Sequence, residues 1–442
     1  MRGIEAALKV LTSGSEGKFS SESLRILADR EKMKPSDISL ASSLVYIVMR
    51  RKELWQKISA DYLRSQEKLP PLVNMAVLVG TGGLLELRRF SGGVLVNGIV
   101  ECLRRDKSSA KYSGLVNAVL HKVIENGAGT VEKFCKSSSL DGRAMFAGIP
   151  VWTLPAWSRT WTRPELHALC EMMGLPSYSC LRASPGKREE LAAMLDAQGL
   201  RHTDSDISPA IRLNESVLPA KVPGFNEGLC TVQSEGSILT ASIVSKFHKS
   251  GPTRILDMCS GRGVKSAQIL QECPGSRIEC WEISEGRLKS AGRELERLNL
   301  SGRATLKPGS ALSLTPDDEP EFVVIDAPCS CSGTWNRKPE SKWRLTWDKL
   351  DSLVITQKKL LERAVNLCKP GGHVLYITCS LFKQENESVI AEILPGHPEC
   401  AEVSGLVEWR GEFFRRGKPY GWYIMPGNPW LDGFYCSLIL KR

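Results

Sequence analysis

Two cysteines lie in short turns that each follow an apolar run, and this placement predicts covalent chemistry. Cys329 lies in the turn 326–330 after the apolar residues 322–325, and Cys379 follows the apolar residues 374–377. In an open parallel sheet, ligands bind outside the carboxyl ends of the strands. If both runs are strands of one such sheet, the two thiols face one crevice and can act on one substrate atom.

The segment between the two cysteines predicts how they come together. The cysteines are 50 positions apart, and residues 345–368 carry apolar residues at helical spacing. A strand, a helix and a second strand joined by a right-handed crossover place both strand ends at the same edge. The alternative is two ordinary buried cysteines, because free cysteine is among the most buried residue types. The neighbouring Asp326 and Pro328 favour the functional interpretation.

A glycine-containing turn predicts a cofactor site. Gly261 and Gly263 follow the expected strand 254–258, where glycine permits close approach of a ligand and a helix N-terminus attracts an anion. Glu282 ends the next expected strand, at a spacing in the sequence typical of a residue that binds a ribose diol. The alternative is an ordinary carboxylate beside a helix N-terminus or in solvent. Ser266 stands where a nicotinamide-binding turn needs its third glycine. S-adenosylmethionine fits better, because its carboxylate is a single anion that needs fewer donors than a pyrophosphate.

Composition bounds the class of protein. The chain has 442 residues, enough for two or three domains, and a net charge of +10 that favours a polyanionic partner. Its 14 cysteines include no C-x-x-C pair and its six histidines lack ligand spacing, so we expect reduced thiols and no metal.

No segment predicts export or membrane insertion. Glu5, Lys9 and residues 13–18 interrupt any apolar run near the start, so we expect no signal peptide. The apolar residues 73–87 are too few to span a bilayer and include three glycines. We therefore expect a cytoplasmic protein without a membrane partner.

Periodicity divides the chain into three domains and predicts a multidomain fold. We expect an all-α domain over residues 1–130, a linker over 127–150, a small α+β module over 150–224, and a Rossmann-like domain over 225–442. The module should hold a helix at 189–198 and a strand at 211–213. The last domain should hold strands at 254–258, 277–281, 322–325 and 374–377, helices at 264–270, 286–298 and 345–368, and an edge strand at 433–440.

Three motifs together resemble the RNA (cytosine-5) methyltransferase family, and most closely its bacterial ribosomal branch, the RsmB (Sun/Fmu) proteins. They are residues 257–266, the sequence Asp326-Ala-Pro-Cys-Ser with residues 337–344 behind it, and Tyr376-Ile-Thr-Cys-Ser followed by residues 385–387. Residues 115–120 resemble the end of the NusB-like RNA-binding domain of that branch. The resemblance implies a NusB-like N-terminal domain, an S-adenosylmethionine-dependent catalytic domain and an RNA substrate, expected to be small-subunit (16S) ribosomal RNA.

The resemblance also implies residue roles. Cys379 would add to C6 of cytosine, Asp326 would hold the base edge, and Cys329 would assist release of the methylated base. The cofactor would be bound by Cys259, Ser260, Gly261, Arg262, Gly263, Val264, Lys265, Glu282, Ser310 and Asp326. The basic residues Arg337, Lys338, Lys342 and Arg344 follow the Cys329 turn, where they would position phosphates.

The chain departs from the family pattern at four positions of the expected cofactor site. Arg262 and Val264 replace a proline and a glycine, Ser310 replaces an acidic residue, and Glu282 replaces an aspartate. These changes leave open an inactive RNA-binding assembly factor that has lost methyl transfer. A transfer-RNA methyltransferase is a second alternative, and a DNA cytosine methyltransferase with Cys329 as nucleophile is a third.

Overall fold

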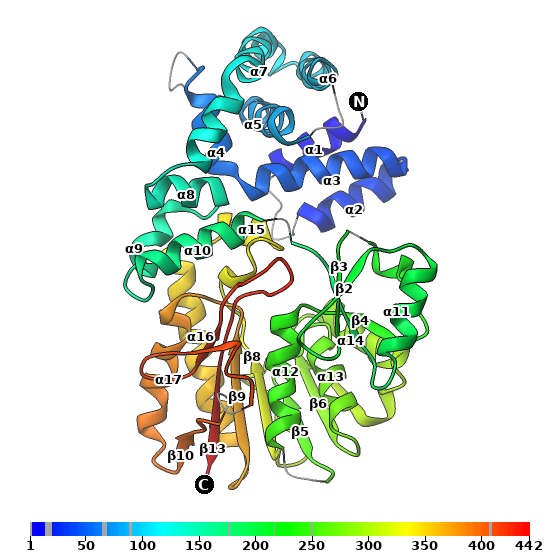
Figure 1. The fold of residues 1–442 in the computed structure, drawn as a ribbon, viewed down its shortest axis with the longest axis vertical. Coiled ribbons are helices and arrows are strands. Elements are labelled where there is room, and N and C mark those ends of the chain that lie inside the picture. Colours follow the sequence, from blue (N-terminus) through cyan, green and yellow to red (C-terminus); the bar gives the residue numbers. More distant parts are fainter. Residues whose placement is uncertain are drawn as a thin grey trace. The chain divides into compact units, whose positions relative to one another are not determined.

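The computed structural model describes residues 2–13, 20–63, 69–87, 91–175, 177–215, 217–248, 251–405 and 409–442 (Figure 1). The chain forms two compact units. The first contains Met1–Leu175 and Lys338–Arg344, and the second contains Pro176–Arg337 and Leu345–Arg442. Among the described residues, no helix is both long enough and apolar enough to cross a membrane.

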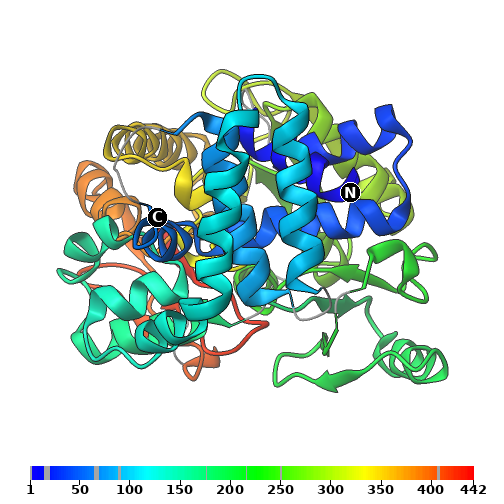
Figure 2. The same ribbon diagram turned by 90° about the horizontal axis from the view of Figure 1, so that it is seen from above.

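The first unit is built of helices, as the sequence predicts. Its core gathers fully buried side chains such as Leu44, Trp55, Val77 and Leu120. Figures 1 and 2 show α6 and α7 side by side. The helices are α1 (Arg2–Thr12), α2 (Ser20–Glu31), α3 (Pro35–Arg50), α4 (Lys52–Ala60), α5 (Pro71–Glu86), α6 (Gly92–Arg105), α7 (Ser113–Cys135), α8 (Leu140–Ala147), α9 (Leu154–Trp157), α10 (Arg163–Gly174) and α15 (Pro339–Trp343).

The predicted linker over 127–150 is wrong in its secondary structure. Helix α7 continues through Gly127 to Cys135, and α8 follows at Leu140–Ala147 with Ser139 accepting a hydrogen bond from the Gly142 amide. Gly127 is buried against Leu85, so the glycine that suggested a break instead allows close packing.

The glycines of α5 have the same role. A Cβ at Gly82 would lie 2.7 Å from Ile47 Cγ2 and 3.0 Å from Trp55 Nε1, and one at Gly80 would lie 2.4 Å from Leu120 Cδ2. The indole of Trp55 donates to the Ile47 carbonyl at 2.9 Å, which fixes its position. Close helix packing therefore explains the glycines in this apolar segment.

We predict that Gly82→Ala lowers the free energy of unfolding of the helical unit. In an open helix the change would gain about 1 kcal/mol of helix propensity, but overpacking a core costs about 1–3 kcal/mol. Gly129→Ala in α7 is the matched control, because a Cβ there meets no atom within 4 Å. Urea unfolding followed by circular dichroism should give opposite shifts for the two variants. Equal gains in both would show that Gly82 has room.

The second unit contains a small antiparallel sheet with the strand order β2-β3-β1-β4. The predicted helix at 189–198 and strand at 211–213 are confirmed as α11 (Arg188–Ala197) and β3 (Ala210–Leu213). The sequence missed β1 (Cys180–Ala183), β2 (His202–Asp204) and β4 (Cys230–Val232), which are three or four residues long.

The large sheet of the second unit is the Rossmann-like element. It has the order β11-β12-β13-β9-β8-β5-β6-β7, with β10 paired to β13. Strands β5 to β9 run parallel, and β8 is buried from Phe322 to Ile325, as expected for a strand covered on both faces. The strands are β5 (Arg254–Asp257), β6 (Arg277–Glu282), β7 (Ala304–Pro308), β8 (Phe322–Asp326), β9 (His373–Thr378), β10 (Cys400–Glu402), β11 (Phe414–Arg416), β12 (Trp422–Ile424) and β13 (Phe434–Lys441).

The helices of this unit agree with the predicted alternation of strands and helices. They are α12 (Glu235–Phe247), α13 (Val264–Glu272), α14 (Glu285–Arg297), α16 (Trp347–Leu367) and α17 (Glu387–Ile393).

The predicted last strand exists, but its edge position is wrong. β13 lies between β9 and β12 and pairs antiparallel with both, which explains why six successive residues from Phe434 to Ile439 are buried.

Candidate active site

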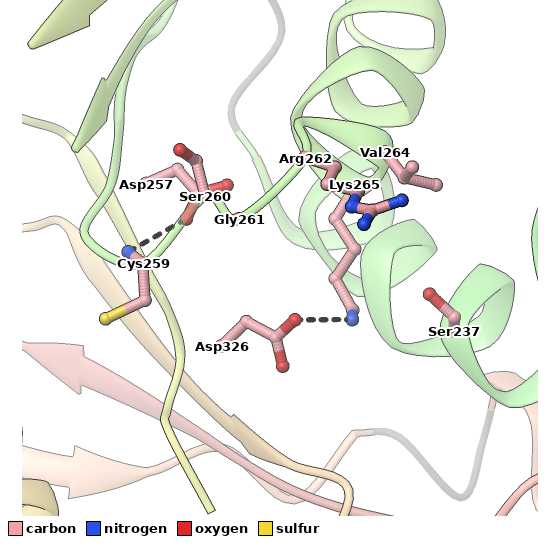
Figure 3. A pocket seen from close by; sticks show the side chains of 9 residues that line it. All are labelled: Ser237, Asp257, Cys259, Ser260, Gly261, Arg262, Val264, Lys265 and Asp326. Atoms are coloured by element: carbon pink, nitrogen blue, oxygen red, sulfur yellow. Dashed lines mark hydrogen bonds and ion pairs between the residues drawn. The ribbon is translucent and has the colours of Figure 1, made fainter. Parts of the chain in front are cut away.

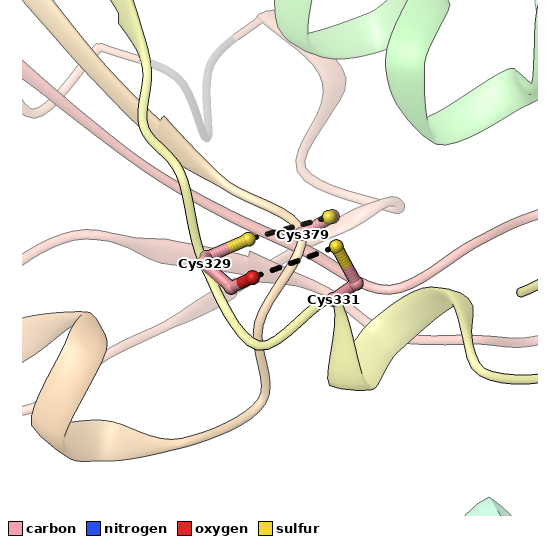
Figure 4. A group of neighbouring side chains, drawn as sticks. All are labelled: Cys329, Cys331 and Cys379. Atoms are coloured by element: carbon pink, nitrogen blue, oxygen red, sulfur yellow. Dashed lines mark hydrogen bonds between the residues drawn. The ribbon is translucent and has the colours of Figure 1, made fainter. Parts of the chain in front are cut away.

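The two cysteine turns meet at the carboxyl ends of β8 and β9. These strands are parallel, with Asp326 opposite Ile377, and α16 connects them. The Sγ atoms of Cys329 and Cys379 lie 3.4 Å apart (Figure 4). The predicted strand–helix–strand arrangement is therefore confirmed, and it brings both sulfurs to one place.

A buried carboxylate ties the two turns together. Glu385 accepts hydrogen bonds from the Ser330 amide at 2.8 Å, from the hydroxyls of Ser330 and Ser380, and from Gln357 Nε2 at 2.9 Å. Burial raises the pKa of Glu385, and these donors oppose the shift. Ser330 follows Cys329 and Ser380 follows Cys379, so one side chain sets the separation of the two sulfurs.

Backbone contacts repeat this connection. The Gly333 amide donates to the Cys379 carbonyl at 2.9 Å, and the Leu381 amide donates to Ser332 Oγ at 2.8 Å. Glu385 belongs to one of the three family motifs, but its role could not be predicted from the sequence. The signal that was available is an acidic residue six positions after Cys379, close to the apolar residues Leu381 and Phe382.

Two neighbouring sulfurs lie beside the Cys329 thiol. The adjacent sulfurs of Cys331 and Cys379, together with burial, hold the pKa of the Cys329 thiol well above its usual range. Either thiol of this pair can donate toward the other, because the two sulfurs lie 3.4 Å apart. The raised pKa disfavours the thiolate form of Cys329.

A cavity of about 130 Å³ lies beside these turns, at the glycine turn after β5 (Figure 3). Gly261 has a φ of +58° and open space where a Cβ would point, so its backbone is accessible to a ligand. Of the predicted cofactor residues, seven line the cavity. They are Cys259, Ser260, Gly261, Arg262, Val264, Lys265 and Asp326. Ser237 and Asp257, which were not predicted as cofactor residues, line the cavity as well.

Two polar pairs organise this cavity. Lys265 Nζ lies 2.7 Å from Asp326 Oδ2 and 5.1 Å from the ring centroid of Phe434. Asp257 accepts from Ser266 Oγ at 2.6 Å and from the Cys259 amide at 3.3 Å. Asp326 thus belongs both to the cavity and to the strand end that leads to Cys329.

Three predicted cofactor residues lie outside the cavity lining. Gly263 begins α13 with a φ of +75°, and a Cβ there would lie 2.9 Å from the Ala291 side chain, so its role is packing against α14. Glu282 is buried and accepts from the Ser284 amide at 2.8 Å, next to α14. The Ser310 hydroxyl accepts from the Leu312 amide at 3.2 Å. The Gly309 amide donates to the Glu282 carbonyl at 3.1 Å, so Glu282 and Ser310 share one rim of the sheet.

The predicted phosphate contacts after the Cys329 turn are wrong for Lys342. Its ammonium is buried in the first unit and donates to the Arg50 carbonyl at 2.6 Å, and burial lowers its pKa well below the usual range. Arg337 pairs with Asp432 at 2.7 Å and Arg344 with Glu340 at 2.6 Å. These contacts give the cluster a structural role within the two units.

Two protein-family models match the chain, one in its N-terminal part and one in its C-terminal part. Residues 247–440 match the family model described as 16S rRNA methyltransferase RsmB/F, and residues 4–125 match the NusB family. The catalytic domain belongs to the RsmB/F methyltransferase family. The resemblance seen in the sequence is confirmed, and the chain is an RNA methyltransferase with a NusB-like domain at its N-terminus.

Relatives match over almost the whole length. Ribosomal RNA small subunit methyltransferase B of Xanthomonas campestris pv. campestris is 27% identical over 414 residues, covering 92% of this chain and 90% of that protein. The enzyme of the same name from Vibrio cholerae is 26% identical and covers 94% and 92%. The crystal structure of PH0851 has a TM-score of 0.77 at 20% identity and covers 100% of this chain and 98% of its own.

The methyl donor of this enzyme is S-adenosylmethionine, and the residues present fit that cofactor. The exposed backbone of Gly261 and the N-terminus of α13 suit its carboxylate, and the acidic side chains of Asp257 and Asp326 suit its ammonium and sulfonium charges. Arg262 and Val264, two of the departures from the family pattern, line this cavity and do not fill it.

We predict that Asp257 makes the stability of this domain pH-dependent. Burial raises its pKa to about 6, above the value of about 3.8 in the unfolded chain. The folded state therefore holds the proton more tightly, so the stabilisation is complete at low pH and is lost as the pH rises from about 4 to about 6. A shift of this size corresponds to at most about 3 kcal/mol.

Thermal unfolding of Asp257→Asn and the parent across this pH window tests the prediction. The parent should lose stability as the pH rises through this window because of Asp257. The variant lacks the titrating carboxyl group, so its melting temperature should fall less than that of the parent over the same pH range. The exposed Asp351→Asn is the control and should follow the parent curve. Parallel curves for Asp257→Asn and the parent would contradict the assigned pKa.

Proposed function

We propose that this RsmB/F methyltransferase methylates C5 of a cytosine in small-subunit (16S) ribosomal RNA through a covalent adduct of Cys379 with C6. The observation that carries the proposal is the 3.4 Å approach of the Cys329 and Cys379 sulfurs, with Cys329 in the turn that begins at Asp326, a residue that lines the cavity. Cytosine C5 is a poor nucleophile, so a thiol addition at C6 is the chemistry that such a pair of cysteines supports.

The mechanism begins with Cys379. Its thiolate forms a bond to C6, and the electrons of the C5–C6 double bond shift toward N3 and create a nucleophilic C5. S-adenosylmethionine, when bound, supplies an electrophilic methyl group that C5 accepts. After the methyl group has been transferred and the donor has left as its neutral thioether, the C5 proton passes to a water molecule. The electron pair of the C5–H bond restores the C5–C6 double bond and expels the Cys379 thiolate. Cys329, next to the same sulfur, assists this release.

Asp326 is placed to support the charge that develops on the base. Its side chain is 34% exposed, while Lys265 holds one carboxylate oxygen at 2.7 Å. The remaining oxygen is free of that ion pair and can accept from the exocyclic amine of cytosine or share a proton with N3. Lys265 is therefore a positioning residue for Asp326 as well as part of the cofactor cavity.

The substrate choice rests on the N-terminal domain and the relatives. A NusB-like domain precedes the catalytic domain, and the relatives that align over at least nine-tenths of their length are named for the small ribosomal subunit. The net charge of +10 favours an RNA partner. The chemistry requires an unstacked cytosine, which favours a single-stranded or opened site.

We predict opposite consequences for the two cysteines. Cys379→Ala removes the nucleophile and should lower transfer of labelled methyl groups to ribosomal RNA at least about 1,000-fold. Cys329→Ala should allow the addition but slow release, so a covalent protein–RNA complex should accumulate on denaturing gels. Cys400→Ser, a half-buried thiol of the same unit, is the control and should behave as the parent.

The reverse pattern would identify Cys329 as the nucleophile, as in the DNA cytosine methyltransferase alternative. Loss of activity in Cys400→Ser together with the others would point to misfolding, and thermal unfolding of each variant checks this. The three variants therefore separate the two assignments of the nucleophile.

We predict that deleting the gene exposes one cytosine of small-subunit ribosomal RNA to bisulfite conversion. Bisulfite sequencing of total RNA from cells with and without the gene measures this directly, and a plasmid copy carrying Cys379→Ala should fail to restore protection. Loss of protection in transfer RNA alone would favour the transfer-RNA alternative. An unchanged profile would favour the inactive assembly factor, and absence of measurable S-adenosylmethionine binding would support it further.

A further inference from the structure

A third sulfur lies beside the two cysteines of the proposed mechanism. The Sγ atoms of Cys329, Cys331 and Cys379 all lie within 4.8 Å of one another, and all three residues are half-buried (Figure 4). The proposed methyl transfer uses Cys379 and Cys329 and gives Cys331 no role. Three thiols this close together can therefore bind a ligand that the methyl transfer does not involve.

The backbone conformation of Cys331 directs its side chain toward the other two cysteines. Its φ of +57° is in the left-handed region that non-glycine residues adopt infrequently, and it begins the short helix Ser332–Thr334. Its carbonyl accepts from the Thr334 amide at 2.9 Å and its thiol approaches the Cys329 carbonyl at 3.6 Å. Figure 4 shows its sulfur directed toward those of Cys329 and Cys379.

We propose that Cys329, Cys331 and Cys379 bind one Zn²⁺ ion and that this metal inhibits methyl transfer. Zn²⁺ binds thiolates at about 2.3 Å in tetrahedral geometry, which separates two sulfurs by about 3.8 Å. The observed 3.4 Å between Cys329 and Cys379, and the upper limit of 4.8 Å for the set, bracket that spacing. Shifts of a few tenths of an ångström in half-buried side chains complete the three-sulfur site, with water at the fourth position.

The chemical consequence is direct. On binding, the thiol protons pass to solvent and the sulfur electron pairs are donated to the metal, so Cys379 no longer has a pair to form the bond to C6. Removal of the ion by a chelator restores the thiols. Soft thiolate ligands favour Zn²⁺ over Mg²⁺ or Ca²⁺, which take oxygen ligands, so the effect is selective for thiophilic metals.

The binding half of this inference is independent of the proposed function, whereas the inhibition half rests on Cys379 as the nucleophile. The two are measured separately. Full-length protein is reduced, stripped with a chelator and titrated with Co²⁺, whose thiolate charge-transfer absorption reports sulfur ligands. Zn²⁺ competition against that signal then gives the affinity for Zn²⁺.

Cys331→Ser is the informative variant, because the hydroxyl keeps the shape of the side chain and can still donate to the Cys329 carbonyl. Cys331 itself forms no bond in the proposed methyl transfer. We expect one Co²⁺ per parent chain with a thiolate band, and at least about 10-fold weaker Zn²⁺ binding in Cys331→Ser. The variant should retain methyl transfer but require at least about 10-fold more Zn²⁺ for inhibition. Cys400→Ser should match the parent in binding and in inhibition.

The inference is overturned if the parent gives no thiolate–cobalt band, or if Cys331→Ser binds Zn²⁺ and is inhibited as the parent is. If no variant transfers methyl groups, the proposed function fails while the cobalt titration still decides whether the metal binds. Metal binding with unimpaired methyl transfer would retain the site and reject its inhibitory role.

Discussion

The buried carboxylate of Glu385 is the constraint on which the active site depends. A charge taken out of water is costly unless hydrogen bonds satisfy it, and Glu385 receives them from Ser330, Ser380 and Gln357. Those donors are the residues that follow the two cysteines and a side chain of the helix between them. The need to satisfy one buried group therefore fixes two turns that are far apart in the sequence.

A second ion pair connects this cysteine site to the cofactor cavity. Lys265, from the first turn of α13, holds Asp326 at the end of β8. Because Asp326 precedes Cys329 by three residues, the same strand end contributes to both halves of the site. The parallel sheet makes this possible, since the ends of β5, β8 and β9 meet at one edge. The departures at Arg262 and Val264 leave this arrangement intact.

The segment after the Cys329 turn shows how chain connectivity joins the two compact units. Residues 338–344 belong to the helical unit, although the catalytic turn that precedes them belongs to the other. Within the helical unit, Lys342 donates to the Arg50 carbonyl and Trp343 Nε1 donates to the Met49 carbonyl at 2.5 Å. The basic residues expected to contact phosphates are thus partly used to fold this segment, because a linear sequence shows charge but not burial.

The sequence by itself determined the order of helices and strands in the catalytic domain, the glycine turn and the two cysteine turns. These are local features, set by apolar periodicity and by residues that follow strand ends. It also indicated the family through three short motifs. It did not reveal that α7 continues through Gly127. A glycine suggests the end of a helix unless its packing against Leu85 is known.

Only the tertiary structure decided which of these features combine. The interior position of β13, the role of Glu385 and the approach of Cys331 to the other two sulfurs depend on contacts between residues tens of positions apart. Such contacts depend on how the strands pair in the sheet and on the free energy of burying polar groups together with their hydrogen-bond partners. Local sequence patterns specify the elements, whereas the sum of these long-range contacts specifies the site.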